Sequence, residues 1–170
     1  MKCLNHSPHE QKMELHIELT KVSPTHHTLG YIREDRTGET VELETRSFLV
    51  HDLIHFVVET EAGLKDSFYG LLCQGAQYSQ LSENGIQDTD DIEVRHTERV
   101  VGMLDGVVKN NVTSSQFMAG LRNVYDASGE KVPHWVFEEF VEKIAKRMTA
   151  LLGEWRGTPF GQPMKLVFSV

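Results

Sequence analysis

The sequence has few cysteines, no long apolar run and no excess of positive charge, and each deficit excludes a class of protein. Its two cysteines, Cys3 and Cys73, are too few for a disulfide framework, so we expect a reducing, cytoplasmic location. No segment approaches the roughly 18 continuous apolar residues that a membrane-spanning helix needs. The first residues, MKCLNHSPHEQK, lack the apolar core of a signal peptide, and we expect none.

The charge balance argues against partners that are polyanions. The chain has 25 acidic and 17 basic residues, which gives a net charge of −8. Contacts with phosphates need an excess of Lys and Arg, so we expect neither nucleic-acid binding nor attachment to an anionic membrane surface. A metal cation or a basic partner remains compatible with this charge. At 170 residues, we expect a single domain over 1–170, with 1–11 as a flexible tail.

Alternating apolar and polar residues predict strands near both ends of the chain. Residues 13–22 alternate, and residues 27–34 and 39–45 follow after short turns, which indicates a three-stranded antiparallel meander. Residues 163–170 alternate again. We expect this C-terminal strand to pair with the meander.

Helical periodicity fills the region between these strands. The expected helices are 47–60 with Ser47 as N-cap, 64–77, one from Thr89–Asp91 to about 108, one from a capping box at Thr113–Gln116, and one from Pro133 to Gly153. Strands first, helices next and one strand returning predict an α+β fold. In it, an antiparallel sheet, made of the N-terminal three-stranded meander plus the C-terminal strand, carries about five helices packed on one face.

The most apolar of these helices also carries a stripe of ionisable side chains. In FLVHDLIHFVVE, residues 48–59, apolar side chains cover roughly 200° of the helix circumference at about 100° per residue. The remaining arc, the polar stripe, holds Phe48, His51, Asp52, His55 and Glu59. It contains none of the Lys, Arg, Ser or Gln typical of a solvated face, so we expect the stripe to be only partly exposed.

The spacing within the polar stripe predicts a metal site. His51, His55 and Glu59 are separated by four residues each, so they lie one above the other on the helix. Paired imidazoles can bind one ion, with Glu59 or Asp52 as the carboxylate. We therefore predict a divalent metal, with zinc as first choice and manganese or iron also suitable. Because a ligating imidazole is neutral, binding should weaken below about pH 6.5.

A purely structural role for the stripe stays open. The same four side chains would form a hydrogen-bond network against a neighbouring helix. On the predicted helix 64–77, Asp66 and Cys73 share one face, where either would complete a metal site. A cysteine such as Cys73 also serves as a small buried apolar residue.

The segment His51-Asp52-Leu53-Ile54-His55, followed by a turn and a second helix, resembles the HDxxH motif of the coenzyme Q biosynthesis family. Members of that family bind a divalent metal, usually zinc, and their motif ends in a glutamate after eleven further residues. The resemblance implies ligand roles for His51, Asp52 and His55, whereas the glutamate position falls on Ser67. The terminal strands do not fit that helical family, so the resemblance supports metal binding and says little about a substrate.

The remaining histidines carry weaker expectations. Cys3, His6 and His9 have ligand-like spacing but fall in the predicted tail, and surface positions are expected for His16, His26, His27, His96 and His134. Two function classes follow. The first is a metal-dependent hydrolase or lyase acting on a small organic substrate through His51 and His55. The second is a non-enzymatic α+β protein that acts as a homodimer or through a protein partner.

Overall fold

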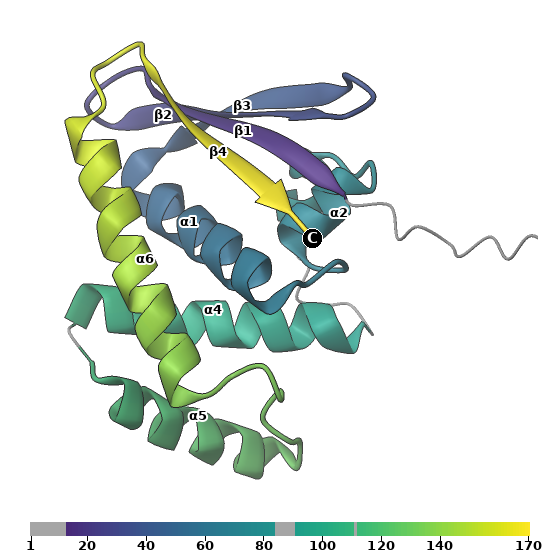
Figure 1. Ribbon diagram of the computed structural model, residues 1–170, viewed down its shortest axis with the longest axis vertical. Coiled ribbons are helices and arrows are strands. Elements are labelled where there is room, and N and C mark those ends of the chain that lie inside the picture. The colour runs from purple at the N-terminus through teal and green to yellow at the C-terminus, as the bar shows by residue number, and fades with distance from the viewer. Residues whose placement is uncertain (1–12, 84–90, 111) are drawn as a thin grey trace, which may run out of the picture.

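The computed structural model describes residues 13–83, 91–110 and 112–170, and it confirms the α+β class (Figure 1). The strands of this part of the chain are β1 (Glu14–Lys21), β2 (His26–Arg33), β3 (Gly38–Glu44) and β4 (Pro163–Ser169). Its helices are α1 (Thr45–Ala62), α2 (Phe68–Cys73), α3 (Tyr78–Glu83), α4 (Ile92–Asn110), α5 (Ser114–Ser128) and α6 (Glu138–Gly157). The predicted tail, with Cys3, His6 and His9, lies outside the described residues.

The four strands form one antiparallel sheet in the order β3-β2-β1-β4. The predicted pairing of the C-terminal strand with the meander is confirmed, since Leu15 lies opposite Phe168 and Ile17 opposite Leu166. Alternation along each strand turns these apolar side chains toward the helices, where they are buried. The opposite face of the sheet stays exposed at Ile32 and Val167.

Helix α1 occupies the centre of the molecule. Figure 1 shows it between the sheet and α4, with α6 crossing on one side. It packs on β3 and β4, and also on α2, α4 and α6. The polar stripe is only partly exposed, as predicted, because Asp52, His55 and Glu59 are buried while Phe48 and His51 are not.

The single helix predicted at 64–77 is wrong in its bounds, because only α2 (Phe68–Cys73) lies within that range and a second short helix, α3, begins just after it at Tyr78. Gly75 adopts a positive φ of 113°, which separates the two helices. Gly70 in α2 lies so close to the preceding loop that a Cβ would fall 2.0 Å from the carbonyl oxygen of Lys65. This glycine therefore permits a close backbone approach to that loop.

Other helix ends differ from the prediction for local reasons. Helix α1 begins at Thr45 with Glu44 as N-cap, and the Ser47 hydroxyl donates a hydrogen bond to the Glu44 carboxylate. Helix α6 begins at Glu138, because Phe137 is extended, and not at Pro133. It also continues past Gly153 to Gly157. The capping box that opens α5 is confirmed.

The prediction of a surface position for His27 is wrong, because this side chain is fully buried. Its Nδ1 lies 3.1 Å from the Oγ1 of Thr45, and its ring stands edge-on to Trp155 with centroids 5.6 Å apart. Burial lowers the pKa of His27, an effect partly offset by the charge of Asp52. Helix α6 thus covers the start of β2, which the sequence pattern predicted to be exposed.

Candidate metal centre

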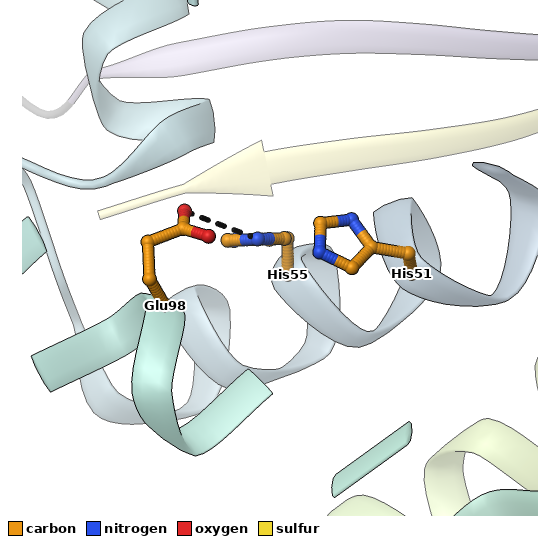
Figure 2. Close-up of side chains that lie close together, drawn as sticks. All are labelled: His51, His55 and Glu98. Atoms are coloured by element: carbon orange, nitrogen blue, oxygen red, sulfur yellow. Dashed lines mark ion pairs between the residues drawn. The ribbon is translucent and has the colours of Figure 1, made fainter. Parts of the chain in front are cut away.

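The two histidines of the polar stripe lie side by side, as their spacing predicts. His51 and His55 leave α1 on the same side, with ring centroids 4.7 Å apart (Figure 2). Their environments differ sharply, because the His55 side chain is 1% exposed and the His51 side chain 44%. One imidazole is therefore embedded in the protein, while the other faces the surface.

The carboxylate that meets these rings comes from another helix. Figure 2 shows Glu98 reaching from α4 toward His55. Its Oε1 lies 3.3 Å from His55 Nε2. One ligand atom each from His51, His55 and Glu98 lie within 4.8 Å of one another, close enough for all three to hold a single ion.

The sequence prediction assigned the carboxylate role to Glu59 or Asp52, and the structure places both behind the rings. Glu59 Oε1 accepts a hydrogen bond from His55 Nδ1 at 2.9 Å. Glu59 Oε2 accepts from the backbone N–H of Tyr69 at 2.8 Å and of Gly70 at 3.3 Å. This buried side chain therefore orients His55 and at the same time caps the N-terminus of α2.

Asp52 occupies the equivalent place behind His51. Its Oδ1 lies 3.5 Å from His51 Nδ1, and its Oδ2 accepts a hydrogen bond from the hydroxyl of Tyr78 at 3.3 Å. Each imidazole thus has a carboxylate of its own helix next to Nδ1. The Nε2 atom of each ring is left as the ligand atom.

The pair of carboxylates around His55 controls its protonation. Burial alone would lower the pKa of His55, but the neighbouring Glu59 and Glu98 outweigh burial and raise it to about 10. Burial raises the pKa of Glu59, against the opposing effects of His55 and two backbone N–H groups. Burial also acts to raise the pKa of Glu98, but His55 and the charge of His51 lower it overall. At neutral pH, the raised pKa of His55 favours the imidazolium form of this side chain.

One nitrogen in this arrangement has an ion-pair neighbour but no hydrogen bond. His55 Nε2 is buried, and although it lies near Glu98, no partner in the described residues gives it a hydrogen bond of acceptable geometry. A buried polar atom without a hydrogen bond is costly. A cation bound between Nε2 and Glu98 would satisfy it, so the residues present fit a metal ion.

The other candidates for completing the site lie elsewhere. Asp66 is exposed, and Cys73 is absent from the cluster; burial raises the pKa of its thiol to about 11, which disfavours a thiolate ligand. Ser67, at the glutamate position of the HDxxH motif, is buried with its Oγ 2.8 Å from the Oγ1 of Thr97. Thr97 precedes Glu98, so the motif position lies against the helix that supplies the carboxylate.

The remaining histidines are not part of the metal centre. His16 and His134 are exposed, as predicted. His96 is half-buried, with Nδ1 2.7 Å from the hydroxyl of Tyr125. A structural role in holding α4 against α5 accounts for it.

Comparison with known protein families, curated proteins and solved structures found no match. The resemblance to the coenzyme Q biosynthesis family therefore stays a prediction based on its short motif. In the part of the chain that the structure describes, no helix is both long enough and apolar enough to cross a membrane.

Proposed function

We propose that the protein binds one divalent metal ion through His51, His55 and Glu98 and uses it in a hydrolase or lyase reaction on a small organic substrate. The observation that carries the proposal is the buried His55 Nε2, which lacks a hydrogen-bond partner and lies 3.3 Å from the Glu98 carboxylate. Two imidazoles and one carboxylate are a ligand set typical of catalytic zinc, and zinc is our first choice of metal.

The contacts of Glu59 and Asp52 with the two histidines also support metal binding. Glu59 and Asp52 face the Nδ1 atoms of the two histidines, an arrangement in which carboxylates orient metal-binding imidazoles. Three carboxyl groups, those of Asp52, Glu59 and Glu98, surround the two imidazoles, and in the described residues none of the three is ion-paired with a lysine or arginine. Carboxyl groups gathered around two imidazoles favour a divalent cation as their shared partner.

Three protein ligands leave room in the coordination sphere for a fourth partner. The exposed side of the centre is at His51, so a small molecule would reach it there. An ion held by these residues supplies Lewis-acid chemistry, because it polarises a carbonyl group or lowers the pKa of a water molecule. The protein residues contribute orientation, through Glu59 and Asp52, and exclude water from the His55 side.

The rival function is a structural network in a non-enzymatic protein. In it, the imidazolium of His55 is held permanently between Glu59 and Glu98, and no ion enters. The two ion-pair distances, 2.9 Å and 3.3 Å, suit that interpretation as well. Metal content therefore decides between the two functions.

The test is zinc binding by untagged protein, measured by calorimetry and elemental analysis after treatment with chelator. We expect one zinc per chain, and at least tenfold weaker binding in Glu98→Gln and in the folded His51→Ala/His55→Ala variant. Glu139→Gln, an exposed carboxylate on α6, is the matched control and should bind as the wild type does. Wild-type protein that stays free of metal at pH 7.5 would refute the proposal and favour the structural network.

A further inference from the structure

A groove away from the proposed metal centre runs along one side of α6. Ala145, Met148, Leu152 and Arg156 line it, at the spacing that places side chains on one side of a helix. From Ala145 to Arg156 this side of the helix is roughly 16 Å long, at a rise of 1.5 Å per residue. The groove has a volume of about 410 Å³, within the range of roughly 300–1,000 Å³ typical of small-molecule sites.

The other wall of the groove comes from the end of α4 and the segment after it. Val107 and Val108 lie in the last turn of α4, and Val112 precedes the N-cap of α5. Figure 1 shows α6 crossing α4 toward this end. Val107 and Met148 are 8% and 1% exposed, whereas Val108, Val112 and Leu152 are only half-buried. The groove is therefore mostly apolar, and part of its apolar lining is uncovered.

Arg156 is the polar group of the groove that is available to a ligand. The hydroxyl of Thr149 donates a hydrogen bond to the carbonyl oxygen of Ala145, and the hydroxyl of Thr113 donates one to the side chain of Gln116. Among the described residues that line the groove, none is acidic. The exposed Arg156 side chain forms no ion pair with any acidic residue that the structure describes.

An unpaired arginine beside an apolar groove favours a ligand that is both anionic and apolar. Acidic residues outnumber basic ones by 25 to 17, and Arg147 and Arg99 are ion-paired with Glu61 and Glu130. The last turn of α6 favours a positive charge, but that does not account for the apolar groove beside Arg156. A guanidinium forms two parallel hydrogen bonds with a carboxylate, which makes this group the natural partner of Arg156.

We propose that the groove binds a monocarboxylic acid with a linear apolar chain, whose carboxylate meets Arg156 and whose chain lies along α6 over Met148. A linear chain fits because the apolar side chains follow one another along the helix. One unpaired guanidinium matches one carboxylate. The inference concerns a second site and does not depend on the proposed metal chemistry.

The experiment titrates octanoate, decanoate and dodecanoate into the full chain at pH 7.5, by calorimetry, at concentrations where the acids do not aggregate. We expect one site per chain and about fourfold tighter binding for each CH₂ group that the groove buries. Decyltrimethylammonium has the same chain as decanoate but a positive head group. It is the matched control ligand and should not displace decanoate.

Variants of the groove test the placement of the ligand. Arg156→Gln should weaken decanoate binding at least tenfold, because the charge-assisted hydrogen bonds are lost. Arg122→Gln, at an exposed position of α5 outside the groove, is the matched control and should bind as the wild type does. Thr149→Trp, at an exposed position of the groove wall, should abolish binding by filling the groove. Arg156 is exposed, so its variant decides the question even if Thr149→Trp fails to fold.

Three results would overturn the inference: a Kd for decanoate of about 1 mM or weaker, displacement by decyltrimethylammonium, or equal affinity in Arg156→Gln and the wild type. A wild-type dimer that Thr149→Trp dissociates would show that a second copy of the chain covers the groove, and it would overturn the inference as well. None of these results bears on metal binding, which is measured separately.

Discussion

Zinc binding should release a proton from His55 at a pH where an ordinary histidine has none to lose. The neighbouring Glu59 and Glu98 carboxylates, which outweigh the opposing effect of burial, raise the pKa of His55 to about 10. The metal-free protein therefore carries this proton at pH 7.5, and ligation removes it. A histidine with an unperturbed pKa of about 6.5 would release only about 0.1 proton under the same conditions. We expect His55 to contribute close to one proton per zinc.

The same coupling sets the pH dependence of binding. Zinc affinity should rise about tenfold per pH unit between pH 7 and 9, or about 1.4 kcal/mol per unit. The sequence alone predicted a loss of binding only below about pH 6.5, and the two carboxylates extend proton competition to higher pH. The contribution of His55 to the folding stability of the metal-free protein changes with pH in the opposite direction to zinc affinity. The contribution of His55 to that stability is complete below about pH 6.5 and is lost as the pH rises toward 10.

Calorimetry in two buffers with different ionisation enthalpies counts the released protons directly. Denaturation midpoints with and without zinc, from pH 7 to 9, test the opposing trends. Glu59→Gln is the matched variant, because its amide oxygen still accepts a hydrogen bond from Nδ1 while the negative charge is gone. This variant should release fewer protons per bound zinc than the wild type. Release near zero at pH 7.5 in the wild type, with affinity flat above pH 7, would refute the assignment of this proton.

Three further predictions concern the fold. Leu53 on α1 is 1% exposed, and Leu53→Ala should lower the free energy of unfolding by about 2–5 kcal/mol. Val124→Ala, at an exposed position of α5, should change it little. Equal denaturation midpoints for Leu53→Ala and the wild type would show that the buried side of α1 is misassigned. Because the pKa of His27 is lowered by burial, its contribution to stability should be lost as the pH falls below about 6.5, and His27→Leu should flatten the acid limb of the stability curve between pH 6.5 and 5. An acid limb of equal slope in both proteins contradicts this. Truncation after Gly161 removes β4, leaves β1 as an uncovered edge and should yield insoluble protein; a monodisperse, folded truncated chain would be inconsistent with the role of this pairing.

The sequence identified those parts of the proposed metal centre that depend on local geometry. His51 and His55 lie on one helix at a fixed spacing, so their proximity follows from helical periodicity alone. Glu98 comes from α4, and its position depends on how α1 and α4 pack. Its only sequence signal is an acidic residue at the edge of the apolar side of α4, which does not identify a partner helix.

The role of Glu59 shows a second limit of sequence analysis. Its spacing from His55 correctly predicts that the two side chains interact. Whether its carboxylate points into the cluster of His51, His55 and Glu98 or away from it depends on the loop after α1, which brings the N–H groups of Tyr69 and Gly70 to it. That loop is shaped by the close contact of Gly70 with Lys65, and such contacts leave no periodic pattern.

The pairing of β1 with β4 also bears on when the surroundings of α1 are completed during folding. Residues such as Leu15 and Phe168, which lie far apart in the sequence, must meet before the sheet is complete. Contacts of such long range are slow to form, because the intervening chain loses entropy when its ends are brought together. Helix α1, apolar over most of its circumference, packs on β4 and gains its full shelter only after this step. We therefore expect metal ions to affect the unfolding rate of the protein more than its folding rate.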